Sequence, residues 1–207
     1  MRGSPTSLSV SRETLLASYF KESAEKADRY AEILQSWGIE RGLIGPREGE
    51  RIWERHISNC LPITTLIPQG VSVIDIGSGA GLPGIVIALA RPDLEITLIE
   101  PLQRRVDFLN EVVSHLELPV TVIRGKAESL KKSFEVVTAR AVAPLPKLLE
   151  ISWHLVKREG ALLAMKGEGA QAEIDSTVPP KHSITTLQTL ELPEFEIARV
   201  IEVRKTA

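Results

Sequence analysis

The residues best suited to chemistry lie in a glycine-rich run that follows a short apolar stretch. The run reads DIGSGAGLPG over residues 75–84 and includes Gly77, Gly79 and Gly81. Glycine lets the backbone turn sharply and approach a ligand closely, because it has no Cβ. Glu100 ends the next apolar run, at the spacing where a carboxylate reaches the hydroxyl groups of a ribose. The pattern predicts that this loop binds a nucleotide-type cofactor.

Asp75 indicates which cofactor is bound. A dinucleotide would place its pyrophosphate at the helix that follows the glycines, where the carboxylate of Asp75 would face it unfavourably. S-adenosylmethionine has an ammonium group for Asp75, a ribose for Glu100, and no phosphate. The D-x-G-x-G pattern resembles the first motif of S-adenosylmethionine-dependent methyltransferases. We expect five residues either to contact this cofactor or to order the loop that binds it. They are Asp75, Gly77, Gly79, Gly81 and Glu100. A nicotinamide-dependent dehydrogenase remains the alternative enzyme.

The elements around the loop predict a Rossmann-like α/β sheet of the class I methyltransferase type. From residue 71 onward, short apolar runs alternate with amphipathic stretches, which is typical of parallel strands joined by crossover helices. We expect strands at 72–76, 95–100, 120–124, 134–138, 161–166, 184–190 and 196–204, with a turn at 192–194. We expect helices at 12–37, 50–66, 83–90, 103–115 and 144–156. Residues 1–68 would then form a helical N-terminal cap, and residues 69–207 the cofactor-binding domain.

Length and composition indicate a globular protein of a reducing compartment. The chain has 207 residues, of which 43% are hydrophobic and 25% charged, so a sizeable core can form. A single cysteine, Cys60, excludes an intramolecular disulfide and a cysteine-based zinc site. The apolar stretch at 85–90 is too short to span a membrane, and residues 1–11 lack the apolar core of a signal peptide. We expect a cytoplasmic protein, whose net charge of −2 argues against bulk coating of nucleic acid.

Missing motifs narrow the identity of the methyl acceptor. Methylation of an exocyclic base amine usually uses a D/N-P-P-Y/F motif, and methylation at C5 of a pyrimidine uses a cysteine nucleophile. Residues 137–143 contain neither, and Cys60 is interpreted as a buried small hydrophobic residue. A ring nitrogen offers a ready lone pair, so positioning would suffice without a general base. The four histidines show no metal-ligand spacing, so no metal is expected.

Four separated motifs follow one another along the chain. They read WERHISNC at 53–60, DIGSGAGLPG at 75–84, ARAVA at 139–143 and LAMKG at 163–167. Together they resemble the bacterial small-subunit rRNA guanine-N7 methyltransferases, also called the glucose-inhibited division protein B family. The resemblance covers about residues 34–167. It implies an enzyme that methylates N7 of a guanine in 16S rRNA. Because the net charge is low, we expect the target to be presented within the small ribosomal subunit or a precursor of it. We also expect a monomer without a metal or membrane partner.

The resemblance also implies roles for particular residues. Its expected cofactor contacts are Gly77, Leu82, Glu100, Ala127, Glu128 and Arg140. Its expected positioning residues near the reaction centre, none of them a base, are Arg140, Lys166, His56 and Arg55. Lys126 stands where the family often has arginine, and residues 37–45 lack the asparagines that many members have there. A non-catalytic RNA-binding module for ribosome assembly remains the alternative outside enzymes.

Overall fold

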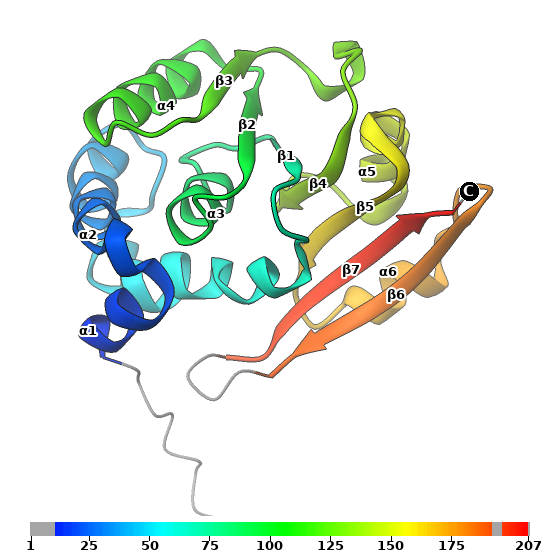
Figure 1. Cartoon of the computed structure of the whole chain (residues 1–207), viewed down its shortest axis with the longest axis horizontal. Helices are drawn as coiled ribbons and strands as arrows, with labels where there is room; N and C mark the ends of the chain where they lie inside the picture. Colours follow the sequence, from blue (N-terminus) through cyan, green and yellow to red (C-terminus); the bar gives the residue numbers. More distant parts are fainter. Residues whose placement is uncertain (1–10, 192–195, 207) are drawn as a thin grey trace, which may run out of the picture.

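The computed structural model describes residues 11–191 and 196–206, which form an α/β fold around a seven-stranded sheet (Figure 1). The strand order is β3-β2-β1-β4-β5-β7-β6. Strands β1 to β5 are parallel, whereas β7 runs antiparallel to both β5 and β6. The bounds are β1 (Ser72–Ile76), β2 (Glu95–Glu100), β3 (Thr121–Arg124), β4 (Phe134–Arg140), β5 (Val156–Lys166), β6 (Ser183–Leu190) and β7 (Ala198–Lys205). The predicted Rossmann-like sheet is confirmed.

Helices cover both faces of the sheet, because successive side chains of its strands point to opposite sides. Val73 packs in the apolar cluster that includes residues of α3 and α4, and the next residue, Ile74, packs in the cluster that includes residues of α5 and α6. These helices are α3 (Gly84–Ala90), α4 (Gln103–His115), α5 (Leu145–Ser152) and α6 (Ala170–Asp175). Sequence analysis missed α6, because six residues are too few to establish a helical period.

The N-terminal helical segment shares the core of α3 and α4. It begins with α1 (Arg12–Leu15), η1 (Leu16–Phe20), η2 (Lys21–Ser23), α2 (Ala24–Ile33) and η3 (Leu34–Gly38). The prediction of one continuous helix over 12–37 is wrong, because Lys21 has a φ of 46° and interrupts it. The interruption lets Phe20 pack edge-to-face on Trp53, with ring centroids 6.1 Å apart. Tertiary packing therefore outweighs the local helical pattern.

The second helical stretch is a series of short turns. These are η4 (Pro46–Arg51), η5 (Ile52–Ile57), η6 (Ser58–Cys60) and η7 (Pro62–Leu66). The stretch begins earlier than predicted because the fixed φ of Pro46 suits the first position of a helix. The division of the chain at residue 68 remains a prediction. Within the described ranges, no helix is long and apolar enough to cross a membrane.

Strand β5 begins five residues earlier than predicted. The helix predicted over 144–156 ends at Ser152 and is followed by η9 (Trp153–Leu155). The early part of β5 contains Glu159 with a φ of 62° and Gly160, where an added Cβ would lie 2.5 Å from the carbonyl oxygen of Glu135. This irregularity resembles a turn in the sequence and hides the strand. The turn predicted at 192–194 lies outside the described residues.

Arg91 forms hydrogen bonds that connect the end of the N-terminal segment to the turn before β2. Its Nη1 donates to the carbonyl oxygens of Thr64 at 3.1 Å and Ile67 at 2.9 Å, and its Nη2 donates to that of Pro68 at 3.1 Å. Its guanidinium also binds Asp93, with Nε 2.7 Å from Oδ1. Hydrogen bonding to Arg91 lowers the pKa of Asp93 to about 2. One side chain therefore holds the residues that lead into β1.

We expect Arg91→Met to lower the free energy of unfolding by about 2 to 3 kcal/mol, because three carbonyl groups lose a charged donor. Urea denaturation followed by circular dichroism measures this change. Arg158→Met, at an exposed position, is the matched control and should change stability by less than about 0.5 kcal/mol. Equal stability of the two variants would contradict the role of Arg91.

Candidate functional site

The carboxyl ends of the parallel strands bring most of the predicted residues to one edge. The glycine loop follows β1, Glu100 ends β2, Arg140 ends β4 and Lys166 ends β5. Strands β1 and β4 are in register there, with Ile76 beside Ala139. Open α/β sheets bind their ligands at this edge. The fold therefore places these side chains around a common space.

The glycine loop keeps one part of its surface open. Gly77, Gly79 and Gly81 have φ values of 63°, 58° and 95°, which side chains rarely adopt. An added Cβ at Gly81 would lie 2.5 Å from Cγ1 of Ile85 and 2.9 Å from the hydroxyl of Tyr30. At Gly79 it would meet no atom closer than the carbonyl oxygen of Gly77, at 3.8 Å. Gly81 is thus required by packing, whereas Gly79 borders a cradle that a side chain would enter.

Tyr30 supports the loop from the N-terminal segment. Its fully buried hydroxyl donates to the carbonyl oxygen of Ala80 at 2.8 Å. Burial raises the pKa of Tyr30 well above its ordinary value, so the hydroxyl stays a donor. Sequence analysis did not find this residue, since a tyrosine on the buried side of a helix is indistinguishable there from an ordinary core residue. The loop is therefore held from outside the sheet as well as from within it.

Asp75 lies beneath the loop with an exposed fraction of 0%. Its Oδ2 accepts a hydrogen bond from the backbone nitrogen of Gly84 at 3.2 Å, and its Oδ1 accepts one from Oγ1 of Thr138 at 3.3 Å. Burial raises the pKa of Asp75 to about 7. These bonds fit the expected ordering of the loop. Direct contact with an ammonium group does not fit a side chain without exposed surface.

Glu100 is anchored at the entrance of the same loop. Its Oε2 accepts from the backbone nitrogen of Gly79 at 3.1 Å, and its Oε1 accepts from that of Leu102 at 3.1 Å. Nη1 of Arg105 lies 3.6 Å from Oε2. A carboxylate oxygen has more than one acceptor site, but Glu100 is only 1% exposed, so its predicted bonds to ribose hydroxyls require the loop around it to open slightly. Its second task, holding Gly79, was not foreseen from the sequence.

The residues at this edge fit S-adenosylmethionine. A Cβ at Gly79 would project into open space, and the carboxylate of Glu100, which accepts from the backbone nitrogen of Gly79, lies beside that space. Nε of Arg105 is a buried donor with no hydrogen-bond partner in the described part of the chain. After β3, the turn η8 (Ala127–Ser129) carries buried Ala127 and exposed Glu128, where the adenine is expected. The individual cofactor contacts, including that of half-buried Leu82, remain predictions.

Arg140 is held by the N-terminal segment rather than by a carboxylate. Its Nη1 lies 3.3 Å from the carbonyl oxygen of His56 and 3.1 Å from Sγ of Cys60, and its Nη2 lies 3.1 Å from Nδ1 of His56. Among the described residues, no carboxylate forms an ion pair with Arg140. Cys60 is buried as predicted, but it also contacts this cation. Burial raises the pKa of its thiol, which disfavours a nucleophilic thiolate.

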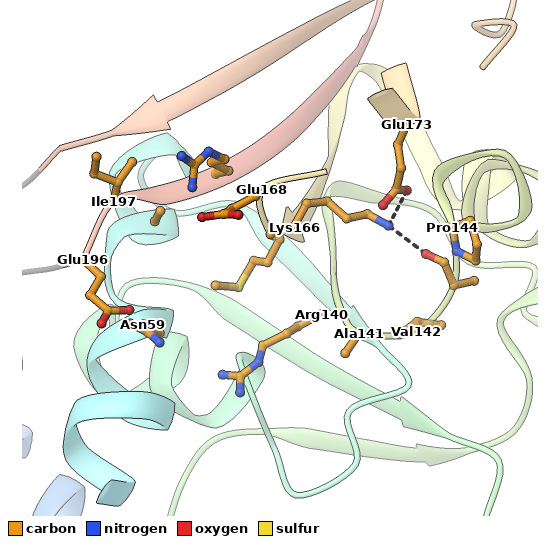
Figure 2. A pocket seen from close by; sticks show the side chains of 15 residues that line it. Asn59, Arg140, Ala141, Val142, Pro144, Lys166, Glu168, Glu173, Glu196 and Ile197 are labelled. Carbon is orange, nitrogen blue, oxygen red and sulfur yellow. Dashed lines mark hydrogen bonds and ion pairs between the residues drawn. The ribbon is translucent and has the colours of Figure 1, made fainter. Parts of the chain in front are cut away.

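A pocket of about 720 Å³ opens beside Arg140, between the ends of β4 and β5 and the start of β7 (Figure 2). Its charged and amide lining residues are Asn59, Arg140, Lys166, Glu168, Glu173, Glu196 and Arg199. Arg199 is opposite Lys166 in the antiparallel β5–β7 ladder. Sequence analysis missed Asn59, Glu168, Glu173, Glu196 and Arg199. The place of β7 beside β5, which brings Arg199 to the pocket, cannot be read from local patterns.

The other predicted positioning residues differ in their surroundings. Nζ of Lys166 donates to the carbonyl oxygen of Ala143 and to Oε2 of Glu173, both at 2.8 Å, so this cation enters the pocket already paired (Figure 2). Arg55 has a side-chain exposure of 51%, lies 3.8 Å from Oε1 of Glu48 and is not among the residues that line the pocket. Lys166 and Arg140 are therefore brought together, and Arg55 is left outside.

The sheet order, the glycine loop with its acidic residues and the pocket at the same edge define a class I S-adenosylmethionine-dependent methyltransferase. Solved structures share this fold. The ribosomal protein L11 methylase of Lactobacillus delbrueckii subsp. bulgaricus has a TM-score of 0.56 at 14% identity, over 71% of this chain and 76% of that chain. A methyltransferase from Pyrococcus furiosus has a TM-score of 0.53 at 12% identity, over 71% of this chain and 84% of that one. Residues 11–191 and 196–206 contain no group of three or more His, Cys, Asp or Glu suited to a metal ion.

Sequence comparison then identifies the family. Residues 23–199 match the GidB family, described as rRNA small subunit methyltransferase G. The enzyme of that name from Thermobifida fusca is 56% identical over 159 residues, or 75% of this chain and 67% of the relative. That from Streptomyces avermitilis is 49% identical over 174 residues, or 82% of this chain and 73% of the relative. The chain belongs to this family, which confirms the predicted resemblance and S-adenosylmethionine as cofactor. The dehydrogenase and the non-catalytic module are not supported.

We expect Asp75→Asn to remove much of the pH dependence of stability between about pH 4 and pH 7. The folded pKa of Asp75 is raised to about 7, above its unfolded value of about 3.9, so the folded state binds more protons in this window. Stability of the ligand-free protein is therefore lost as pH rises through it, by up to about 4 kcal/mol, and the amide does not ionise. Thermal unfolding at several pH values measures this. Asp107→Asn, at an exposed position of α4, is the control, and equal pH slopes for both variants would exclude this role of burial.

We expect Gly79→Val to abolish binding of S-adenosylhomocysteine, because the branched side chain would enter the cradle beside Glu100. Gly70→Val is a matched control. Gly70 has a φ of 66° and no atom within 4 Å of an added Cβ, and it precedes β1 at the opposite edge of the sheet. Both variants carry similar backbone strain, so calorimetry should find lost affinity only in Gly79→Val. A comparable loss of affinity in both variants would show that the space at Gly79 is not part of the cofactor site.

Proposed function

We propose that this enzyme transfers the methyl group of S-adenosylmethionine to N7 of a guanine in 16S rRNA. Its relatives are named ribosomal RNA small subunit methyltransferase G, which supports an rRNA substrate. The observation that carries the proposal is the pocket beside the cofactor loop, which balances cations against carboxylates. Its cations are Arg140, Lys166 and Arg199, and its carboxylates are Glu168, Glu173 and Glu196.

The surroundings of the carboxylates support a ring nitrogen as the acceptor. S-adenosylmethionine supplies an electrophilic methyl group, and N7 of guanine attacks it with a lone pair that carries no proton. Asp75 is buried beneath the loop, and Oε2 of Glu173 already accepts from Lys166 and from the backbone nitrogen of Leu145 at 2.7 Å. Neither is free to act as a base. Exposed Glu168 and Glu196 also line the pocket, but a nitrogen that attacks through an unprotonated lone pair requires no base. Holding the base and the methyl donor in line is then the main catalytic task of the chain.

The balance of charge also suits the product. Methylation of N7 leaves a positively charged base, which a purely cationic pocket would disfavour. Arg140 contacts His56 and Cys60, and Lys166 pairs with Glu173. Neither positive charge therefore acts only on the methylated guanine. Both remain able to bind a phosphate or the carboxylate of the cofactor. We assign them to orientation of the substrate and cofactor.

The overall charge supports a folded target. The chain has 25 Lys and Arg against 27 Asp and Glu, so it lacks the excess of basic residues that binds any RNA through its phosphates. Recognition of RNA shape is the physical alternative, and a base already unstacked costs less to bring to the methyl group. We infer that a monomer acts in the cytoplasm on the small subunit or an assembly precursor.

We expect initial methylation rates to be highest on small subunits, lower on protein-free 16S rRNA and lowest on a short hairpin with the target base, at matched salt. Mass spectrometry of digested rRNA should find 7-methylguanosine that is absent with Gly79→Val, the cofactor-binding variant. Equal rates on the hairpin and the subunit would contradict recognition of a folded target, but they would leave the proposed reaction standing. Modification at another base or atom would overturn the proposed reaction.

A further inference from the structure

Arg140 is coupled to a carboxylate that lies outside the pocket. A guanidinium has donors but no acceptor, so Nδ1 of His56, 3.1 Å from Nη2 of Arg140, must present a lone pair. The proton of a neutral imidazole then lies on Nε2. That nitrogen is 3.3 Å from Oε2 of Glu48, within ion-pair distance but without the alignment of a hydrogen bond. The three side chains form a line from η4 through η5 to the end of β4.

The charged groups around His56 act in opposite directions. Burial lowers the pKa of the imidazole, and Arg140 of β4 and Arg55 of η5 lower it further, while Glu48 of η4 raises it. The buried thiol of Cys60 lies 3.1 Å from Nη1 of Arg140, and the charge of Arg140 also acts on buried Asp75 of β1. Neutral His56 can accept from Arg140. Protonated His56 would lose the lone pair and place a second cation beside the guanidinium.

We propose that Glu48 is a positioning residue that holds His56 in the tautomer able to orient Arg140 toward the pocket. The tautomer is inferred from this chain alone, whereas its effect on catalysis rests on the proposed function of Arg140. Glu48 does not touch the pocket itself. The negative charge of its carboxylate, 3.3 Å from Nε2, favours the tautomer that has its proton on that nitrogen, and Nδ1 is then free to accept from Arg140.

A purely structural role is the alternative reading of Glu48, since its Oε1 also lies 3.8 Å from Nη1 of Arg55. That role would make Glu48 a brace between η4 and η5. It would affect stability, but it would leave the tautomer of His56 unchanged. It would also leave unchanged the acidic limb of the pH–rate profile, the pH range in which the methylation rate falls as His56 becomes protonated. The two roles are therefore separable by measurement.

The tautomer is tested first, by long-range proton–nitrogen NMR of protein with labelled histidines at pH 7.5. Four histidines give few signals, and the signal lost in His56→Asn identifies His56. We expect a neutral ring with its proton on Nε2. A protonated ring, or a proton on Nδ1, would overturn the proposal whether or not the enzyme methylates rRNA.

The coupling is tested by single-turnover methylation of small subunits between pH 5.5 and 8.5. Removing the carboxylate removes a group that favours imidazolium, so Glu48→Gln should shift the acidic limb to lower pH by about half a unit. The plateau rate should also fall, by about tenfold, as Arg140 loses orientation. Glu54→Gln is the control, since Glu54 lies on η5 but pairs with Arg51. An acidic limb that stays in place in Glu48→Gln would overturn the proposal.

Replacement of His56 gives an independent test. The side-chain oxygen of Asn can accept from Arg140 near the position of Nδ1, and it does not titrate in this range. We expect His56→Asn to be faster than His56→Ala and to lose the acidic limb. Equal rates, in variants that bind S-adenosylhomocysteine normally, would overturn the proposal. Failure of the wild-type enzyme to methylate rRNA would instead count against the proposed function.

Discussion

The burial of one carboxylate beneath the glycine loop is the constraint on which the rest of the site depends. Asp75 joins the end of β1 to the start of α3 through Gly84 and to β4 through Thr138. Its desolvation opposes ionisation, as its raised pKa indicates, so the loop is held by a carboxylate that is costly to charge. Glu100 holds the upper side of the same loop through Gly79. Two carboxylates thus fix a backbone that glycine alone would leave free to move.

The N-terminal helices complete this arrangement from the side. Tyr30 binds the carbonyl group of Ala80, and the turn that carries His56 and Cys60 receives Arg140 from the end of β4. These contacts are short and largely buried, so they add geometric definition as well as stability. The glycine loop and the pocket beside Arg140 are therefore each bounded partly by the sheet and partly by the helical segment. Arg91 holds the two parts of the chain together at the opposite edge.

Much of this fold was predictable from sequence because buried parallel strands leave continuous apolar runs. Residues 72–76 and 95–100 match β1 and β2, and the glycine loop between them has a local signature. The interruption at Lys21 and the early start of β5 were missed because they depend on contacts with distant residues. Arg199 enters the pocket through an antiparallel pairing, and Glu48 reaches His56 through space. No local spacing encodes such relations.

The contacts of Arg140 have a consequence for how the protein can vary. An appended module can be exchanged between relatives if its interface is general, but this helical segment supplies hydrogen-bond acceptors to a side chain that lines the pocket. A substitution at His56 or Cys60 changes the surroundings of a residue eighty or more positions later in the chain. The segment and the sheet are therefore expected to change together during evolution. A chimera of two relatives would have to take both sides of this contact from the same parent.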